Sequence, residues 1–303
     1  MKIMRHLIAL AIIALVFGYM ASQVIENRDV LSAIPWQSHY GKIILHLVGL
    51  LLMQSLLCAG WSRLLKMHGS TVSLPSLVFS FFVPNLGKYL PGKILFFAGR
   101  VELTYRVGST RKTGLSTFFF ESLFIVLAAA LFIPASLSLF ISLPAIVWLF
   151  FYAVTFVLLL YLTPKTDWLL SLFNRLLAMA RQSPLAIWPA ASEIRKTLAL
   201  YVLMWMIYGL SCALLAMIFI DVGWVELLPV AAIFVVAWLA GFLSIITPAG
   251  LGVREAVLIV LMQPMADTAA IVMLALLARI SWTLVEMGIA SIALLLPVNT
   301  RQP

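Results

Sequence analysis

The sequence predicts an all-α protein that crosses a membrane several times. Hydrophobic residues make up 64% of the 303 residues and charged residues only 10%, which leaves too little polar surface to cover a soluble domain of this length. A helical span needs roughly 20 apolar residues to cross about 30 Å of hydrocarbon. We therefore expect a single transmembrane domain over residues 1–303. Stretches that approach the length of a span lie at 7–21, 43–62, 75–98, 114–133, 144–162, 197–220, 227–246, 250–263 and 268–296.

The first stretch, 7–21, follows a basic start with Lys2 and Arg5 and ends at small residues. That outline fits a signal peptide as well as a first transmembrane helix. We expect an uncleaved first span, because no soluble segment follows it for export.

Two of the apolar stretches, 75–98 and the combined stretch 227–263, are interrupted by proline and glycine. Proline donates no backbone hydrogen bond and glycine permits tight turns, so each interruption should leave unpaired N–H groups at membrane depth. Irregular backbone survives there only where it lines a polar cavity. We expect each stretch to form a re-entrant helical hairpin, with a kinked helix as the alternative. The residues expected at the two tips are Pro84, Gly87, Pro91, Gly92, Pro248, Gly250 and Gly252.

The distribution of lysine and arginine distinguishes these topologies, because positive charge accumulates in the cytoplasmic loops of membrane proteins. Eight ordinary crossings would place eleven of the loop cations outside and five inside. Six full spans with two oppositely oriented re-entrant hairpins place fourteen inside and two outside. The charge count therefore favours six spans and two hairpins, with both termini on the cytoplasmic side of a bacterial inner membrane.

The same topology makes the two halves of the chain inverted repeats. The first half covers about 43–133 with hairpin 75–98, and the second covers about 197–296 with hairpin 227–263. In transporters built this way, the substrate site lies where broken helices of the two repeats meet. The segment 163–196 is expected in the cytoplasm, either as an amphipathic helix on the membrane surface or as an ordinary connecting helix.

Ionisable residues at membrane depth mark the candidate site. Each costs at least about 2.5–3.5 kcal/mol on insertion scales, so such residues normally face a cavity or one another. Four cations, with Arg100 close by, and three acids fall there. Because cations are in excess, the expected ligand is an anion such as the phosphate head group of a lipid. The expected phosphate contacts are Asn85, Lys88, Lys93, Arg100, Arg254 and Arg279, and the acids are Glu121, Glu255 and Glu286.

The acids admit two interpretations. They can gate the cavity or carry protons, or they can form ion pairs that hold helices together. Arg279 and Glu286 lie seven residues apart, about 10.5 Å along a helix, so we expect them to flank one cavity without pairing. Glu121 is placed to neutralise a lysine of the first hairpin.

Three function classes fit these features. The leading one is a translocase for an anionic phospholipid or a polyprenyl-phosphate glycolipid; the others are a small-anion transporter or channel, and a non-transporting scaffold of an envelope-lipid pathway. An enzyme, a cofactor or a metal site is not expected, since the chain carries neither H-E-x-x-H nor a Walker phosphate loop. The expected partners are a lipid with a phosphate head group and a lipid-modifying or glycosyl-transfer enzyme, with a homodimer possible and nucleic acid excluded.

Two motifs carry a resemblance to a known family. They are Asn85-x-Gly87-Lys88-Tyr89-x-Pro91-Gly92-Lys93, followed by Gly99-Arg100 and Glu121, and Pro248-x-Gly250-x-Gly252-Val253-Arg254-Glu255, followed by Arg279. Over about residues 40–296 the chain resembles the flippase-like transmembrane region of lysylphosphatidylglycerol synthases. The resemblance implies a stand-alone member that moves a lipid between leaflets. The chain ends at Pro303 without an aminoacyl-transfer domain, so we expect only translocation to carry over.

Overall fold

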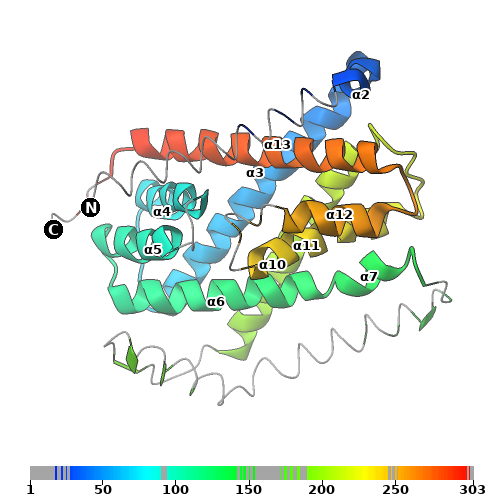
Figure 1. Cartoon of the computed structure of the whole chain (residues 1–303). Coiled ribbons are helices and arrows are strands. Elements are labelled where there is room, and N and C mark those ends of the chain that lie inside the picture. Colours follow the sequence, from blue (N-terminus) through cyan, green and yellow to red (C-terminus); the bar gives the residue numbers. More distant parts are fainter. Residues whose placement is uncertain are drawn as a thin grey trace.

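The computed structural model describes residues 28–89, 94–141, 190–244 and 252–298, together with isolated positions elsewhere. All regular structure in these ranges is helical (Figure 1). The predicted spans 7–21 and 144–162 fall outside these ranges, as does the linker 163–196 up to residue 189. The described elements are α2 (Arg28–Ala33), α3 (Trp36–Met67), α4 (Leu74–Phe82), η1 (Val83–Tyr89), α5 (Ile94–Arg106), α6 (Arg111–Ala130), α7 (Ile133–Leu137), α10 (Ala191–Ala216), α11 (Leu227–Leu243), α12 (Val253–Met262) and α13 (Thr268–Leu295).

Four helical segments are long and apolar enough to cross a membrane. They are Trp36–Met67, Arg111–Leu137, Ala191–Ala216 and Thr268–Leu295. Each contains most of a predicted span, so the prediction of long apolar helices in these four places is confirmed. The first is longer than predicted at both ends, because its helix begins at Trp36 and continues past the apolar stretch through Arg63 and Lys66.

One predicted loop is wrong. The predicted stretches 75–98 and 114–133 leave residues 99–113, with Arg100 among the loop cations, as a cytoplasmic loop between them, yet α5 continues as a helix to Arg106. Arg100, counted among the loop cations, is therefore carried into the protein and is only 2% exposed. Arg100 follows the apolar stretch by two positions, and a charged residue there predicts the end of a helix. The helix nevertheless continues past Arg100, and its residues Val101 and Thr104 are buried.

The long helices α3 and α10 pack against each other in opposite directions. Near the start of α3, His46 Nδ1 lies 2.9 Å from the carbonyl oxygen of Ser211, and Lys42 Nζ donates to the carbonyl of Met217 at 3.0 Å. Gly49 permits this close crossing, because a Cβ there would lie 2.5 Å from the Cβ of Ser211. Small residues at helix crossings are the usual way in which membrane helices approach closely.

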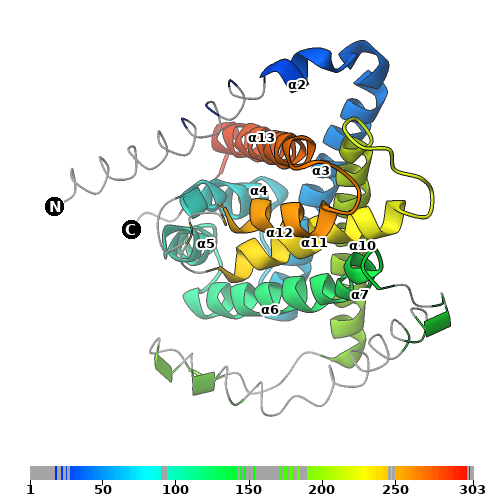
Figure 2. The same ribbon diagram turned by 45° about the vertical axis from the view of Figure 1, so that its right-hand side comes forward.

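Both interrupted segments form pairs of short helices, as the proline and glycine residues predict. The first pair is α4 and α5, joined through η1, and the second is α11 and α12. None of the four reaches 20 residues, and the longest, α11, has 17 residues and a length of about 25 Å. Figures 1 and 2 show the two pairs lying between α6 and α13 and entering that space from opposite ends.

The turn of the second pair depends on glycine. Gly250 and Gly252 adopt φ angles of 75° and 79°, in the left-handed region that L side chains rarely occupy. A Cβ at Gly250 would also lie 2.7 Å from the Cα of Gly241. The chain can therefore fold back tightly onto the end of α11, which directs the first turn of α12 toward the centre of the bundle.

Positive side chains gather at one end of the bundle. The C-terminal end of α3 meets the start of α10, where Arg63 pairs with Glu193 at 2.5 Å. It also meets α6, where the His68 and Phe120 rings are 5.2 Å apart. Seven described cations belong to this end: Arg63, Lys66, Arg106, Arg111, Lys112, Arg195 and Lys196. At the other end, Asp221 follows α10 and Asp267 caps α13, and Lys42 contacts the end of α10.

Candidate functional site

Two adjoining cavities lie where the helix pairs meet. Their volumes are about 40 Å³ and about 80 Å³. Four side chains line both of them: Lys88, Trp238, Arg254 and Trp282. Together we call these two spaces the central cavity.

Every described charged residue that lines the central cavity is one that the sequence predicts at the site. They are Lys88, Arg100, Glu121, Arg254, Glu255, Arg279 and Glu286. They come from both helix pairs and from the two helices that flank them, α6 and α13. The predicted contact Lys93 and the predicted tip residues Pro91, Gly92 and Pro248 lie outside the described residues.

The buried pair of Arg100 and Glu121 closes one wall of the cavity. Arg100 Nη1 donates to the Glu121 carboxylate at 3.2 Å, and Nη2 donates to Asn85 Oδ1 at 2.8 Å. The guanidinium carbon also lies 3.9 Å from the ring centroid of Phe81 and 4.7 Å from that of Trp61. These contacts tie η1, α5 and α6 together.

This pairing corrects the expectation that Glu121 neutralises a lysine of the first hairpin. Its partner is Arg100, because the continued helix α5 brings that guanidinium to α6. The side chains of the pair are only 2% and 4% exposed. Of the two interpretations left open for the acids, these contacts favour the ion pair that holds helices together for Glu121.

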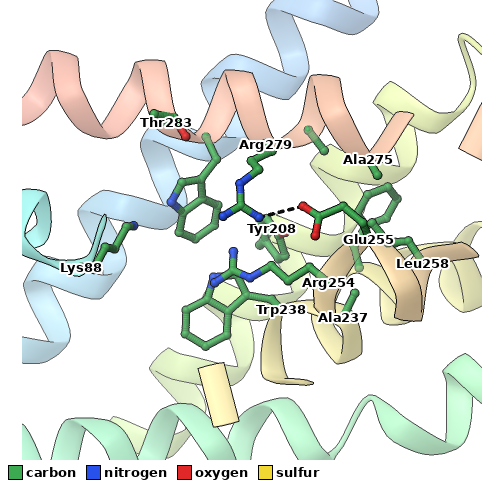
Figure 3. Close-up of a pocket in the computed structure, with 13 residues that line it drawn as sticks. Lys88, Tyr208, Ala237, Trp238, Arg254, Glu255, Leu258, Ala275, Arg279 and Thr283 are labelled. Carbon is green, nitrogen blue, oxygen red and sulfur yellow. Dashed lines mark hydrogen bonds and ion pairs between the residues drawn. The ribbon is translucent and has the colours of Figure 1, made fainter. Parts of the chain in front are cut away.

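The other two acids pair with different cations. Arg279 on α13 donates from Nη1 to Glu255 Oε1 on α12 at 2.7 Å, as Figure 3 shows. Glu286, also on α13, forms an ion pair with Lys88 on η1. Arg279 and Glu286 thus line the cavity without pairing with each other, as their spacing predicts. The Lys88–Glu286 pair joins the first helix pair to the second half of the chain.

Two tryptophans that the sequence did not single out complete the walls. The Arg254 guanidinium carbon lies 5.1 Å from the ring centroid of Trp238, and Lys88 Nζ lies 5.5 Å from that of Trp282. The close approach of Arg254 to α11 requires Gly241, since a Cβ there would lie 2.5 Å from Arg254 Cγ. Figure 3 shows the Arg254 side chain lying over Trp238 and directed toward the same space as Arg279.

The charge of the central cavity is positive. Four described cations and three described carboxylates line it, so the formal sum is 4 − 3 = +1. In a low-dielectric interior, an excess charge acts over a longer range than it does in water. The arrangement can therefore attract and hold a small anionic group.

Four of the predicted tip residues, Pro84, Gly87, Gly250 and Gly252, are among the described residues. Pro84 is buried against Gly99, and Gly87 lies where a Cβ would come within 2.9 Å of the backbone of Leu95. Gly252 immediately precedes α12, whose first turn carries Arg254 and Glu255 into the cavity. Within the described ranges, no three His, Cys, Asp or Glu residues are grouped as metal ligands.

A scan of protein-family models gave no match to the chain, and a search of curated proteins gave none either. The resemblance to the flippase-like transmembrane region therefore stays a prediction. The geometry of the central cavity is the basis for the function proposed below.

Proposed function

We propose that the protein is a lipid translocase that moves an anionic phospholipid or a polyprenyl-phosphate glycolipid between leaflets of a bacterial inner membrane. One observation supports this most: four cations from both halves of the chain line a cavity between two interrupted helix pairs. Charged groups at membrane depth are costly and normally serve a pathway or a ligand. A phosphate head group would offset the excess positive charge of the cavity.

The size of the cavity supports a head group as its ligand. A cavity needs a volume of about 10–15 Å³ to hold one water molecule. Volumes of about 40 Å³ and 80 Å³ therefore accommodate a phosphate group but not a whole lipid. In this proposal the acyl or prenyl chains stay in the bilayer. The larger space has apolar walls that include Leu57, Phe118 and Phe242, which suit the glycerol or prenyl end of a lipid better than a hydrated small ion.

The proposal includes the orientation of the chain. The two helix pairs enter as re-entrant hairpins from opposite faces, and the end that carries seven cations lies in the cytoplasm, where positive loops accumulate. The first turn of α12 then contributes the positive end of its helix dipole to the cavity. A lipid-modifying or glycosyl-transfer enzyme as partner, and a homodimer, stay predictions.

The Arg254→Gln variant tests the proposed function. We expect flipping of a fluorescent phosphatidylglycerol in proteoliposomes to fall by about tenfold or more, which corresponds to the loss of one hydrogen bond from a charged donor. Lys196→Gln is the matched control, because Lys196 is exposed at the basic end of the bundle and should leave the rate unchanged.

The same preparation distinguishes the alternatives. Flux of inorganic phosphate or chloride without movement of lipid would favour a small-anion transporter and contradict the proposal. No transport of either kind by the wild-type protein would favour a scaffold.

A further inference from the structure

We infer that Trp238 and Trp282 are the ligand-orienting residues of the central cavity, and that their indole N–H groups donate hydrogen bonds to the oxygens of the bound phosphate group. This inference rests on the proposed function and adds to it the specific donors that recognise the ligand. Neither residue was among the contacts expected from the sequence.

The first observation is that both indole nitrogens are buried donors with no acceptor. Trp238 is 9% exposed and Trp282 is 7% exposed, and neither Nε1 makes a hydrogen bond to a residue that the structure describes. Leaving such a donor unsatisfied costs about 1–3 kcal/mol, so native proteins keep few of them. Both belong to rings that line the central cavity, so an acceptor held in that cavity is the partner that this inference supplies.

The second observation is the arrangement of the two rings. Trp238 lies on α11 and Trp282 on α13, and their ring centroids are 6.3 Å apart. Each lines both parts of the central cavity. The two indole rings therefore border the same space as the cations, where one phosphate group can meet both rings.

The cations next to the rings define the chemistry of the acceptor. Lys88 lies over Trp282 and Arg254 lies over Trp238, so each indole has a positive group beside it. A site that combines cations with neutral N–H donors suits an anion that has several acceptor oxygens. A phosphate monoester or diester has this chemistry, whether it belongs to a lipid head group or is free in solution.

Other tryptophans of the protein provide the comparison. Trp205 Nε1 donates to the carbonyl of Ile125 at 3.0 Å, so its indole is satisfied by the fold. Trp61 Nε1 is buried and makes no hydrogen bond, but Trp61 lines neither part of the central cavity. Trp61 also lies beside a cation of the site, Arg100, but does not line the cavity, so it is a matched control for removal of an unsatisfied indole N–H that the ligand does not reach.

The test removes the N–H and keeps the shape of the ring. Benzothienylalanine, in which sulfur replaces the indole N–H, is placed at Trp238, at Trp282 or at Trp61 of the full-length protein in nanodiscs. Binding of phosphatidylglycerol is measured by native mass spectrometry, with diacylglycerol as the lipid without phosphate and inorganic phosphate as the free anion. We expect replacement of Trp238 or of Trp282 to weaken binding of phosphatidylglycerol by about tenfold. Replacement of Trp61 should leave the binding unchanged.

The outcomes distinguish this inference from the proposed function. If Arg254→Gln weakens binding of phosphatidylglycerol while both indole replacements leave it intact, the tryptophan inference is overturned and the proposed function stands. If inorganic phosphate binds in an indole-dependent way and phosphatidylglycerol does not, the inference stands and the lipid substrate is overturned. If phosphatidylglycerol binds no better than diacylglycerol and inorganic phosphate does not bind, both are overturned.

Discussion

The Glu121→Gln variant is expected to lose about 3–5 kcal/mol of stability, since removing one partner of a buried ion pair leaves an uncompensated charge. Arg100 would remain 2% exposed, with Asn85 as its hydrogen-bonding neighbour and aromatic rings around it. These surroundings cannot replace the lost carboxylate charge. Thermal unfolding of the purified protein in a fixed lipid composition measures the effect.

The double variant Arg100→Met/Glu121→Met is the matched control for that prediction. Apolar residues of similar volume often replace a buried ion pair with little change in stability. We therefore expect the double variant to regain most of the stability lost in Glu121→Gln and to keep most of its flipping rate. Loss of flipping in a stably folded double variant would show instead that this pair takes part in transport.

The Lys88–Glu286 pair should behave differently, because Lys88 also lines both parts of the central cavity. Lys88→Gln and Glu286→Gln are each expected to destabilise the protein by several kcal/mol, since the Glu286 side chain is 2% exposed and its partner 19% exposed. The double variant Lys88→Gln/Glu286→Gln restores charge balance and should recover stability. Its flipping of phosphatidylglycerol should nevertheless stay about tenfold or more below that of the wild type, because the cation is absent.

This double-variant cycle requires two measurements on the same four proteins, namely unfolding temperature and the rate of flipping. Recovery of both properties in the double variant would mean that the pair only holds η1 against α13. Failure to recover stability would mean that Lys88 and Glu286 act independently of each other. Only the combination of recovered stability and low flipping agrees with a role of Lys88 in binding the head group.

The charged residues of the site were predictable because charge is rare in this chain and costly at membrane depth. Residues such as Lys88 and Glu286 stand out in apolar surroundings without any knowledge of the fold. The interruptions of the helices were also predictable, since Pro84 and Gly250 break regular structure through local backbone chemistry.

The pairing of those charges was not predictable from the sequence. Glu121 meets Arg100 only because α5 continues for two turns beyond the apolar stretch, and this continuation is stabilised by burial against the rest of the bundle. The tryptophans were missed for a related reason. A tryptophan in an apolar helix is predicted to pack in the hydrophobic core. Only the fold shows that the Nε1 atoms of Trp238 and Trp282 have no acceptor among the described residues and belong to rings that line a cationic cavity.

The pairing also changes how the two halves correspond. Glu121 follows Pro84 by 37 residues and Glu286 follows Pro248 by 38, so sequence spacing alone aligns these two acids. In the structure, the pair equivalent to Arg100–Glu121 is Glu255–Arg279, because each joins the second helix of a helix pair to the long helix that follows. In the first pair the cation lies on the short helix and the acid on the long helix, and in the second pair this order is reversed. Glu286 pairs instead with Lys88 of the other half.

A cryo-electron microscopy structure in nanodiscs that contain phosphatidylglycerol tests the central claim most directly, because it shows the bilayer and any bound lipid together. The account predicts that η1 and the turn between α11 and α12 lie within the hydrocarbon layer, with phosphate density about 3 Å from Lys88 or Arg254. Turns located in the head-group layers, or a central cavity that holds only water beside resolved annular lipids, would contradict it.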